Sequence, residues 1–75
     1  MNKGANDTLA RQWAMLRLIP RAPRKTTSRD LCRQLEQLGH STSPRTVERD
    51  LHALSGRFAL VADDSSKPYG WSWAR

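Results

Sequence analysis

The chain has 75 residues, enough for one small domain with a single core, and this length excludes a multidomain enzyme. Thirteen lysines and arginines against seven acidic residues give a formal net charge of +6, and ten of the thirteen are arginines. The planar arginine fork matches phosphate oxygens and the guanine edge, so a nucleic acid is favoured over a membrane surface, the competing anion. We expect one domain over residues 1–75, with residues 1–6 disordered.

The composition also narrows the setting of the protein. The longest apolar run, residues 58–62, is too short for a membrane-spanning helix, which needs about 20 residues. No basic stretch followed by an apolar one opens the chain, so no export signal is indicated and we expect a cytoplasmic protein without a membrane partner. The single cysteine, Cys32, has no second cysteine for a disulfide or a thiolate zinc site, so packing must hold the fold.

The first predicted helix begins at Asn6 or Asp7, either of which can cap it, and runs to about Ile19. Its larger apolar side chains recur at one-turn spacing: Leu9, Trp13 and Leu16. This spacing predicts that they form the core-facing stripe of the helix. Pro20 ends the helix because proline has no N–H to continue it.

Residues 21–25 contain Pro23 and three cations, and they predict an extended, solvated connector. A second helix follows, with Thr27 as N-cap and Asp30 three residues later in a variant of the capping box. Its predicted core stripe is Leu31, Leu35 and Leu38. Gly39 is expected to end this helix.

Ser43 and Pro44 predict the start of a third helix, since serine is a preferred N-cap and proline a preferred first helical residue. Its apolar side chains share one face: Val47, Leu51 and Leu54. Ser55 and Gly56 end it. After a tight turn over residues 39–43, this helix is in the position of the second helix of a helix-turn-helix.

Two short β-prone runs, residues 58–62 and 69–73, flank the polar segment 63–68 and predict a hairpin. The second run carries three aromatic side chains on one face: Tyr69, Trp71 and Trp73. We expect them in the core rather than on a base-stacking platform, because a small domain without disulfides needs large buried side chains. The predicted fold is therefore mainly α with a small β-hairpin, a winged helix-turn-helix of three helices plus a wing.

The face of the third helix opposite its apolar stripe carries Arg45, Arg49 and His52. In a helix-turn-helix this face enters the major groove, so we expect base contacts from Arg45, Thr46 and Arg49. A solvated basic face without a ligand is the alternative. The neighbouring Asp50 is an unusual choice on a surface that meets DNA, and we expect it to pair with Arg49 or with an arginine of a neighbouring helix.

A second set of polar and basic residues surrounds this helix and is expected to contact the DNA backbone. Its members are Ser43, Arg21, Arg24, Lys25, Arg29, His52 and Lys67. Solvated surface charge is the alternative for any one of them. His40, His52 and Cys32 have no neighbouring ligands or acid–base partners, so we expect no metal, no cofactor and no catalytic site.

Three segments of the chain resemble bacterial WYL-domain transcriptional regulators. Residues 43–51 (Ser-Pro-Arg-Thr-Val-Glu-Arg-Asp-Leu) are similar to their recognition helix, residues 11–20 to their first helix and residues 66–73 to the end of their wing. The likeness covers roughly residues 9–75. The recognition-helix pattern alone would be shared with the wider DeoR-like group.

The resemblance implies a sequence-specific regulator of transcription, commonly a repressor, that binds double-stranded DNA as a homodimer, with an inverted-repeat operator as the expected target. It also implies a C-terminal WYL domain that senses a ligand and helps dimerisation, and we do not expect residues 1–75 to include that domain. We therefore expect an isolated DNA-binding domain or a short relative. DNA contact falls to Ser43, Arg45, Thr46 and Arg49, and a structural polar role to Asp50.

A second function stays open beside DNA binding. Winged helices also serve as protein–protein interaction modules, and the basic stripe would then face an acidic partner. An enzyme is not expected, because the sequence shows no paired acid and base, no activated nucleophile and no metal set.

Overall fold

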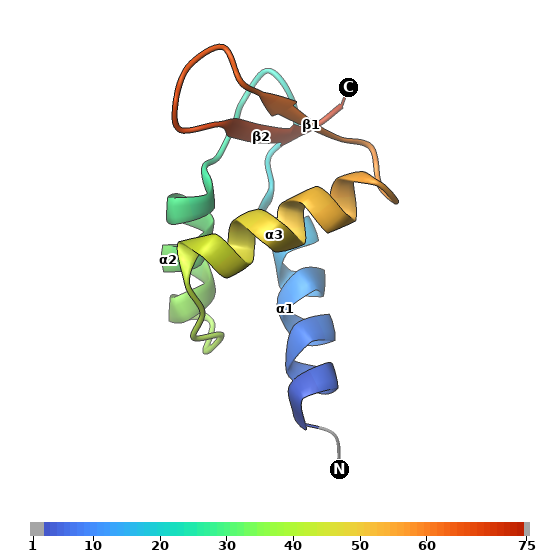
Figure 1. The fold of residues 1–75 in the computed structure, drawn as a ribbon, viewed down its shortest axis with the longest axis vertical. Coiled ribbons are helices and arrows are strands. Elements are labelled where there is room, and N and C mark those ends of the chain that lie inside the picture. Colours follow the sequence, from blue (N-terminus) through green and yellow to red (C-terminus); the bar gives the residue numbers. More distant parts are fainter. Residues whose placement is uncertain (1–2, 75) are drawn as a thin grey trace.

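The computed structural model describes the backbone of residues 3–74 and the side chains of residues 7–74. Three helices precede a two-stranded antiparallel hairpin (Figure 1). The elements are α1 (Lys3–Leu18), α2 (Ser28–Gln37), α3 (Pro44–Ser55), β1 (Leu60–Asp63) and β2 (Gly70–Trp73). The predicted fold class, mainly α with a small hairpin in a winged-helix layout, is confirmed.

Helix α1 begins earlier than predicted. It starts at Lys3, so Asn6 and Asp7 lie inside the helix and neither caps it. Residues 3–6, expected to be disordered, are helical, whereas residues 1–2 lie outside the described part of the chain. The prediction was wrong because asparagine and aspartate cost a helix interior less than about 1 kcal/mol each, so their presence does not require a helix start.

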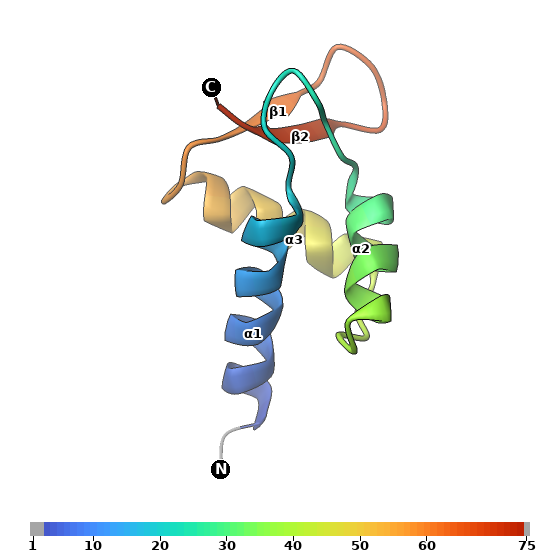
Figure 2. The same ribbon diagram turned by 180° about the vertical axis from the view of Figure 1, so that it is seen from behind.

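The core-facing stripe of α1 was also predicted on the wrong side. Leu9 is 68% exposed and Trp13 is 63% exposed, while Met15 and Ile19 are buried and Leu16 is half-buried against the core. Two apolar faces satisfy the helical period in α1, and periodicity alone does not say which one meets neighbours. Figures 1 and 2 show the first half of α1 extending away from the other elements.

Helix α2 is capped at both ends as its sequence suggests. The Thr27 hydroxyl accepts a hydrogen bond from the backbone N–H of Asp30 at 3.1 Å. At the other end Gly39 has φ +91° and, with His40, donates its backbone N–H to the last carbonyls of the helix. This Schellman geometry turns the chain sharply toward α3. Leu38, predicted in the core, is 58% exposed because it is the C-cap residue, where the chain leaves the helical path.

Helix α3 begins as predicted, with the Ser43 hydroxyl accepting from the Thr46 N–H at 3.2 Å and Pro44 in the first turn. Its apolar face is buried as predicted: Val47, Leu51 and Leu54. This face packs most extensively on α2 and also meets β1. The buried core gathers side chains from all five elements, and its members are Met15, Ile19, Leu31, Cys32, Leu35, Val47, Leu51, Leu54, Leu60 and Trp71.

The hairpin pairs Leu60 with Trp73 and Asp63 with Gly70, so both strands are shorter than the predicted runs. Trp71 is 1% exposed, and Tyr69 and Trp73 are partly buried against the core. These positions confirm that the aromatic face of the second strand packs inward. The indole N–H of Trp73 also donates to the Leu16 carbonyl of α1 at 3.0 Å.

The connector between α1 and α2 was predicted to be solvated, and this is wrong for its backbone. Thr26 exchanges two backbone hydrogen bonds with Trp71, at 2.9 and 2.7 Å. The Ala22 N–H donates to the Trp73 carbonyl at 2.9 Å, and the Trp73 N–H donates to the Pro20 carbonyl at 2.8 Å. Residues 20–26 therefore line the second edge of β2. The two segments are about 50 positions apart in the chain, and no local sequence pattern predicts their contact.

The turn after α2 yields a stability prediction. Replacing Gly39 by alanine should lower the free energy of unfolding by about 1 to 2 kcal/mol, because a φ of +91° strains any residue with a Cβ. The measurement is urea unfolding followed by tryptophan fluorescence. The matched control is Gly56→Ala, since Gly56 has φ −79° and its added Cβ meets nothing closer than 3.5 Å. Equal losses in the two variants would contradict the assigned turn.

Candidate nucleic-acid interface

The outer face of α3 presents two unpaired arginines. Arg45 and Arg49 are exposed, and neither guanidinium group takes part in a hydrogen bond or ion pair with another described residue. They lie one turn apart, opposite the buried Val47 and Leu51. The predicted arrangement of a buried apolar face and an exposed basic face is therefore present. Two guanidinium groups one turn apart can reach neighbouring bases or phosphates of a duplex.

Ser43 and Thr46 form a small hydroxyl pair at the start of α3. The Ser43 hydroxyl caps the helix and donates to the Thr46 hydroxyl oxygen at 3.1 Å. Ser43 is thus committed to the cap, while the Thr46 hydroxyl keeps its own proton for an outside acceptor. Thr46 is half-buried on the flank of the arginine face.

A groove of about 560 Å³ separates α3 from the loop of the hairpin. It is lined by Ser28, Pro44, Arg45, Glu48, His52, Lys67, Pro68 and Tyr69. The groove brings together three predicted contact residues, Arg45, His52 and Lys67, that belong to two different elements. Arg29 lines an adjoining hollow beside Thr27, at the start of α2. Basic side chains and the first turn of a helix thus surround one depression, the arrangement that a phosphate backbone can follow.

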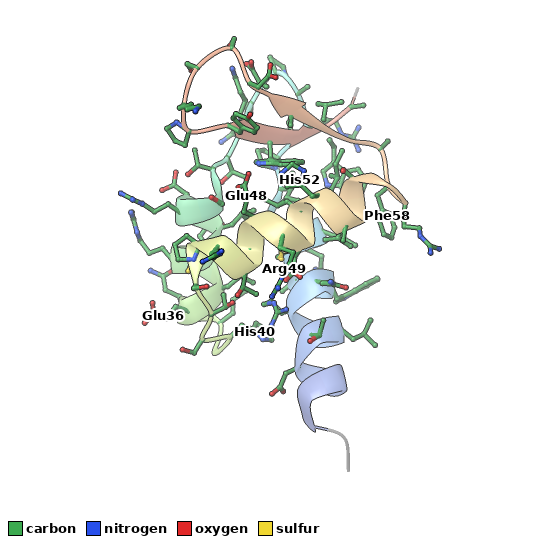
Figure 3. The ribbon with its side chains drawn as sticks, viewed as in Figure 1. Glu36, His40, Glu48, Arg49, His52 and Phe58 are labelled. Atoms are coloured by element: carbon green, nitrogen blue, oxygen red, sulfur yellow. The ribbon has the colours of Figure 1, made fainter. Side chains whose placement is uncertain are left out.

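His52 is exposed but already has partners. Its Nε2 lies 3.4 Å from a Glu48 carboxylate oxygen, and its ring meets Trp71 edge-on with the centroids 5.1 Å apart. Figure 3 shows Glu48 and His52 rising from α3 toward the hairpin. His52 therefore links α3 to the wing as well as facing the groove. Glu48 is a carboxylate inside this basic groove, and only the tertiary structure places it there.

The base of the wing is held by Lys25 and Asp63, which form an exposed ion pair. Ser65 donates to the same carboxylate twice, through its N–H at 3.0 Å and its hydroxyl at 2.6 Å. The hydrogen bond from Lys25, followed by those from Ser65, holds the pKa of Asp63 well below its ordinary value. Lys25, which is predicted to contact the DNA backbone, has its ammonium group paired with Asp63.

The connector arginines lie apart from the groove. Arg21 and Arg24 are exposed on the segment that runs along β2, and neither lines the groove beside α3. Figure 2 shows this segment on the side of the hairpin turned away from the view of Figure 1. The structure therefore divides the predicted backbone contacts into a group near α3 and a group at the connector.

Asp50 has the intraprotein partner expected for it, on a neighbouring helix. The Arg11 Nε of α1 lies 2.7 Å from one carboxylate oxygen, and the Gln12 amide donates to the other at 3.3 Å. Asp50 is 7% exposed, so this pair is removed from solvent. Arg49 is not its partner. The sequence signal was an acidic residue next to the basic face of a helix expected to meet DNA.

Among the described residues, no group of three or more His, Cys, Asp or Glu side chains could hold a metal ion. None of the described helices has the length and apolar character required to cross a bilayer. No family model, no curated protein and no solved structure matches the chain.

The Asp63 site yields a pH prediction. Because the pKa of Asp63 is lower in the folded state, its contribution to stability is present above its unfolded pKa and disappears as the pH falls through the folded value. Asp63→Asn should be less stable than the parent at neutral pH, and the difference should shrink as the pH falls below about 4. Urea unfolding of both proteins between pH 7 and pH 2.5 measures this difference in stability. Asp64→Asn is the control, and a difference independent of pH would contradict the assignment.

Proposed function

We propose that this chain is a DNA-binding domain that recognises duplex DNA through the outer face of α3. The observation that carries the proposal is the pair Arg45 and Arg49, exposed and without intraprotein partners on a capped helix whose opposite face is buried. An α-helix fits the major groove of B-DNA, and there arginine can donate two hydrogen bonds to guanine. Arg45, Arg49 and Thr46 are the proposed base contacts.

The groove beside α3 supports a second set of contacts, to the sugar–phosphate backbone. Lys67, on the hairpin loop, is an exposed cation that lines this groove, and Arg29, at the start of α2, is an exposed cation that lines the adjoining hollow. His52 lies in α3 itself, and Ser43 is the N-cap of that helix. Such contacts fix the position of a protein on the duplex, while base contacts supply sequence preference. We place Arg21 and Arg24 outside this central surface, and we omit Lys25 because Asp63 already pairs with it.

The biological setting that fits these contacts is regulation of transcription by occupancy of a DNA site. The likeness of residues 43–51 to the recognition helix of WYL-domain regulators supports this setting, and it favours a repressor that binds an inverted repeat as a homodimer. A single winged helix contacts few base pairs, so one copy should bind modestly and lose affinity steeply with salt. Pairing on a repeated site would raise the affinity.

The experiment that tests the proposed function is selection from a randomised duplex pool, followed by binding across salt concentrations. We expect an enriched motif and a salt dependence equivalent to about three or more phosphates, with each phosphate contributing a slope of about −0.9. A slope of about one phosphate with no enriched motif would contradict the proposal and favour an acidic protein as the partner of the same face.

A substitution separates base reading from general charge. Arg49→Ala should weaken binding to the selected duplex by about 1 to 3 kcal/mol and relax the preference at one base position, because a bidentate arginine contact is lost. Fluorescence anisotropy on selected and scrambled duplexes measures both effects. Arg17→Ala removes the same charge from α1, whose exposed Arg17 is remote from the groove, and it should change both affinities only slightly. Equal losses on both duplexes would make Arg49 a phosphate contact.

A further inference from the structure

The contact between α1 and α3 contains a buried charge whose partners all come from one helix. Both oxygens of the Asp50 carboxylate are engaged, one by Arg11 and one by Gln12. These two residues are consecutive in α1 and lie nearly 40 positions before Asp50 in the sequence. The side chains of the ion pair are 15% and 10% exposed, so the pair is largely shielded from water. Each oxygen of the Asp50 carboxylate therefore has its own donor in α1.

Stability alone does not account for this arrangement. Removing two charges from water costs about as much as their attraction returns, and apolar residues of similar volume often serve as well or better. The buried face of α3 already packs through Val47, Leu51 and Leu54. A buried ion pair differs from apolar packing in one respect: its hydrogen bonds require a defined direction and distance. Directional constraint is therefore the property that Arg11 and Gln12 add to the contact.

The constrained residue is adjacent to a proposed base contact. Asp50 follows Arg49 directly, and consecutive residues of a helix point about 100° apart. Holding Asp50 against α1 therefore limits rotation of α3 about its own axis, and it sets the direction in which Arg49 and Arg45 leave the helix. A rotation of about 15° would move a group about 6 Å from the helix axis by roughly 1.6 Å. Such a shift exceeds the tolerance of a hydrogen bond to a base edge.

We infer that Arg11, assisted by Gln12, is a positioning residue for DNA recognition: it holds Asp50 and thereby aims the arginine face of α3. Arg11 itself touches no DNA in this scheme. The inference rests on the proposed function, since it concerns the accuracy with which the same face reads a sequence. It predicts that loss of the pair lowers discrimination between DNA sequences more than it lowers general affinity for DNA.

The test is a charge-neutral double variant, Arg11→Met with Asp50→Leu, which leaves the net charge at +6. We expect each single variant to be clearly less stable, because each leaves an unpaired polar or charged group, and the double variant to recover most of the lost stability. In fluorescence anisotropy at a fixed salt concentration, the double variant should bind the selected duplex at least about tenfold more weakly, and it should bind the scrambled duplex within about twofold of the parent. Repeated over a series of salt concentrations, the binding should show the same salt slope as the parent.

A matched control removes a different ion pair. Asp30→Asn with Arg33→Gln is also charge-neutral, and it breaks an exposed ion pair whose two members both lie in α2. This control variant should discriminate between the selected and the scrambled duplex as well as the parent does. Gln12→Leu is a milder change at the Asp50 contact, since it removes only the 3.3 Å hydrogen bond from Gln12. It should lower discrimination between the selected and the scrambled duplex by about threefold. If the double variant does not fold, the discrimination measured for Gln12→Leu tests the inference.

The outcomes separate the inference from the proposed function. A parent protein that distinguishes no duplex sequence would overturn the proposed function, and the inference with it. A parent that discriminates, together with a folded double variant or a Gln12→Leu variant of equal discrimination, would overturn the inference alone. Equal weakening on selected and scrambled duplexes would also overturn it, because that result would assign Arg11 and Asp50 a general structural role.

Discussion

Burial of one face of α3 is the interaction on which the rest of this structure depends. Val47 and Leu51 are fully enclosed, with α2 on one side and the hairpin on another. A helix that buries one side must present the other, and here the other side carries Arg45 and Arg49. The α2 caps and the Gly39 turn contribute by fixing where α3 begins. The proposed function follows from this orientation.

The acidic residues pair with selected basic side chains and leave others unpaired. Asp50 holds Arg11, Asp63 holds Lys25, and Glu48 lies beside His52. Each of these contacts joins or braces parts of the fold near α3 or the wing. The arginines on the outer face of α3 have no such partner among the described side chains. A surface potential concentrated on this face is the expected result, and polyanions respond to it.

Helix α3 is held by side-chain contacts on both flanks as well as by its apolar face. Arg11 and Gln12 hold it on the side of α1, while the His52 ring rests against Trp71 on the side of the wing. Trp71 in turn exchanges backbone hydrogen bonds with Thr26 of the connector. The wing and α1 therefore contact α3 directly and help to fix its orientation, and the connector contributes through Trp71. A binding face set on such a braced helix can be more accurate than one set on a loop.

The sequence by itself determined the local features: the caps Thr27 and Ser43, the end of α1 just before Pro20, the apolar face of α3, and with it the exposure of Arg45 and Arg49. These features depend on neighbours within one turn, where periodicity and cap chemistry act directly. Tertiary structure alone decided which apolar face of α1 is buried, that Lys25 pairs with Asp63, that Asp50 is held by Arg11, and that residues 20–26 line β2. Each of these needs a partner distant in the chain, and local spacing carries no information about which distant segment will be adjacent after folding.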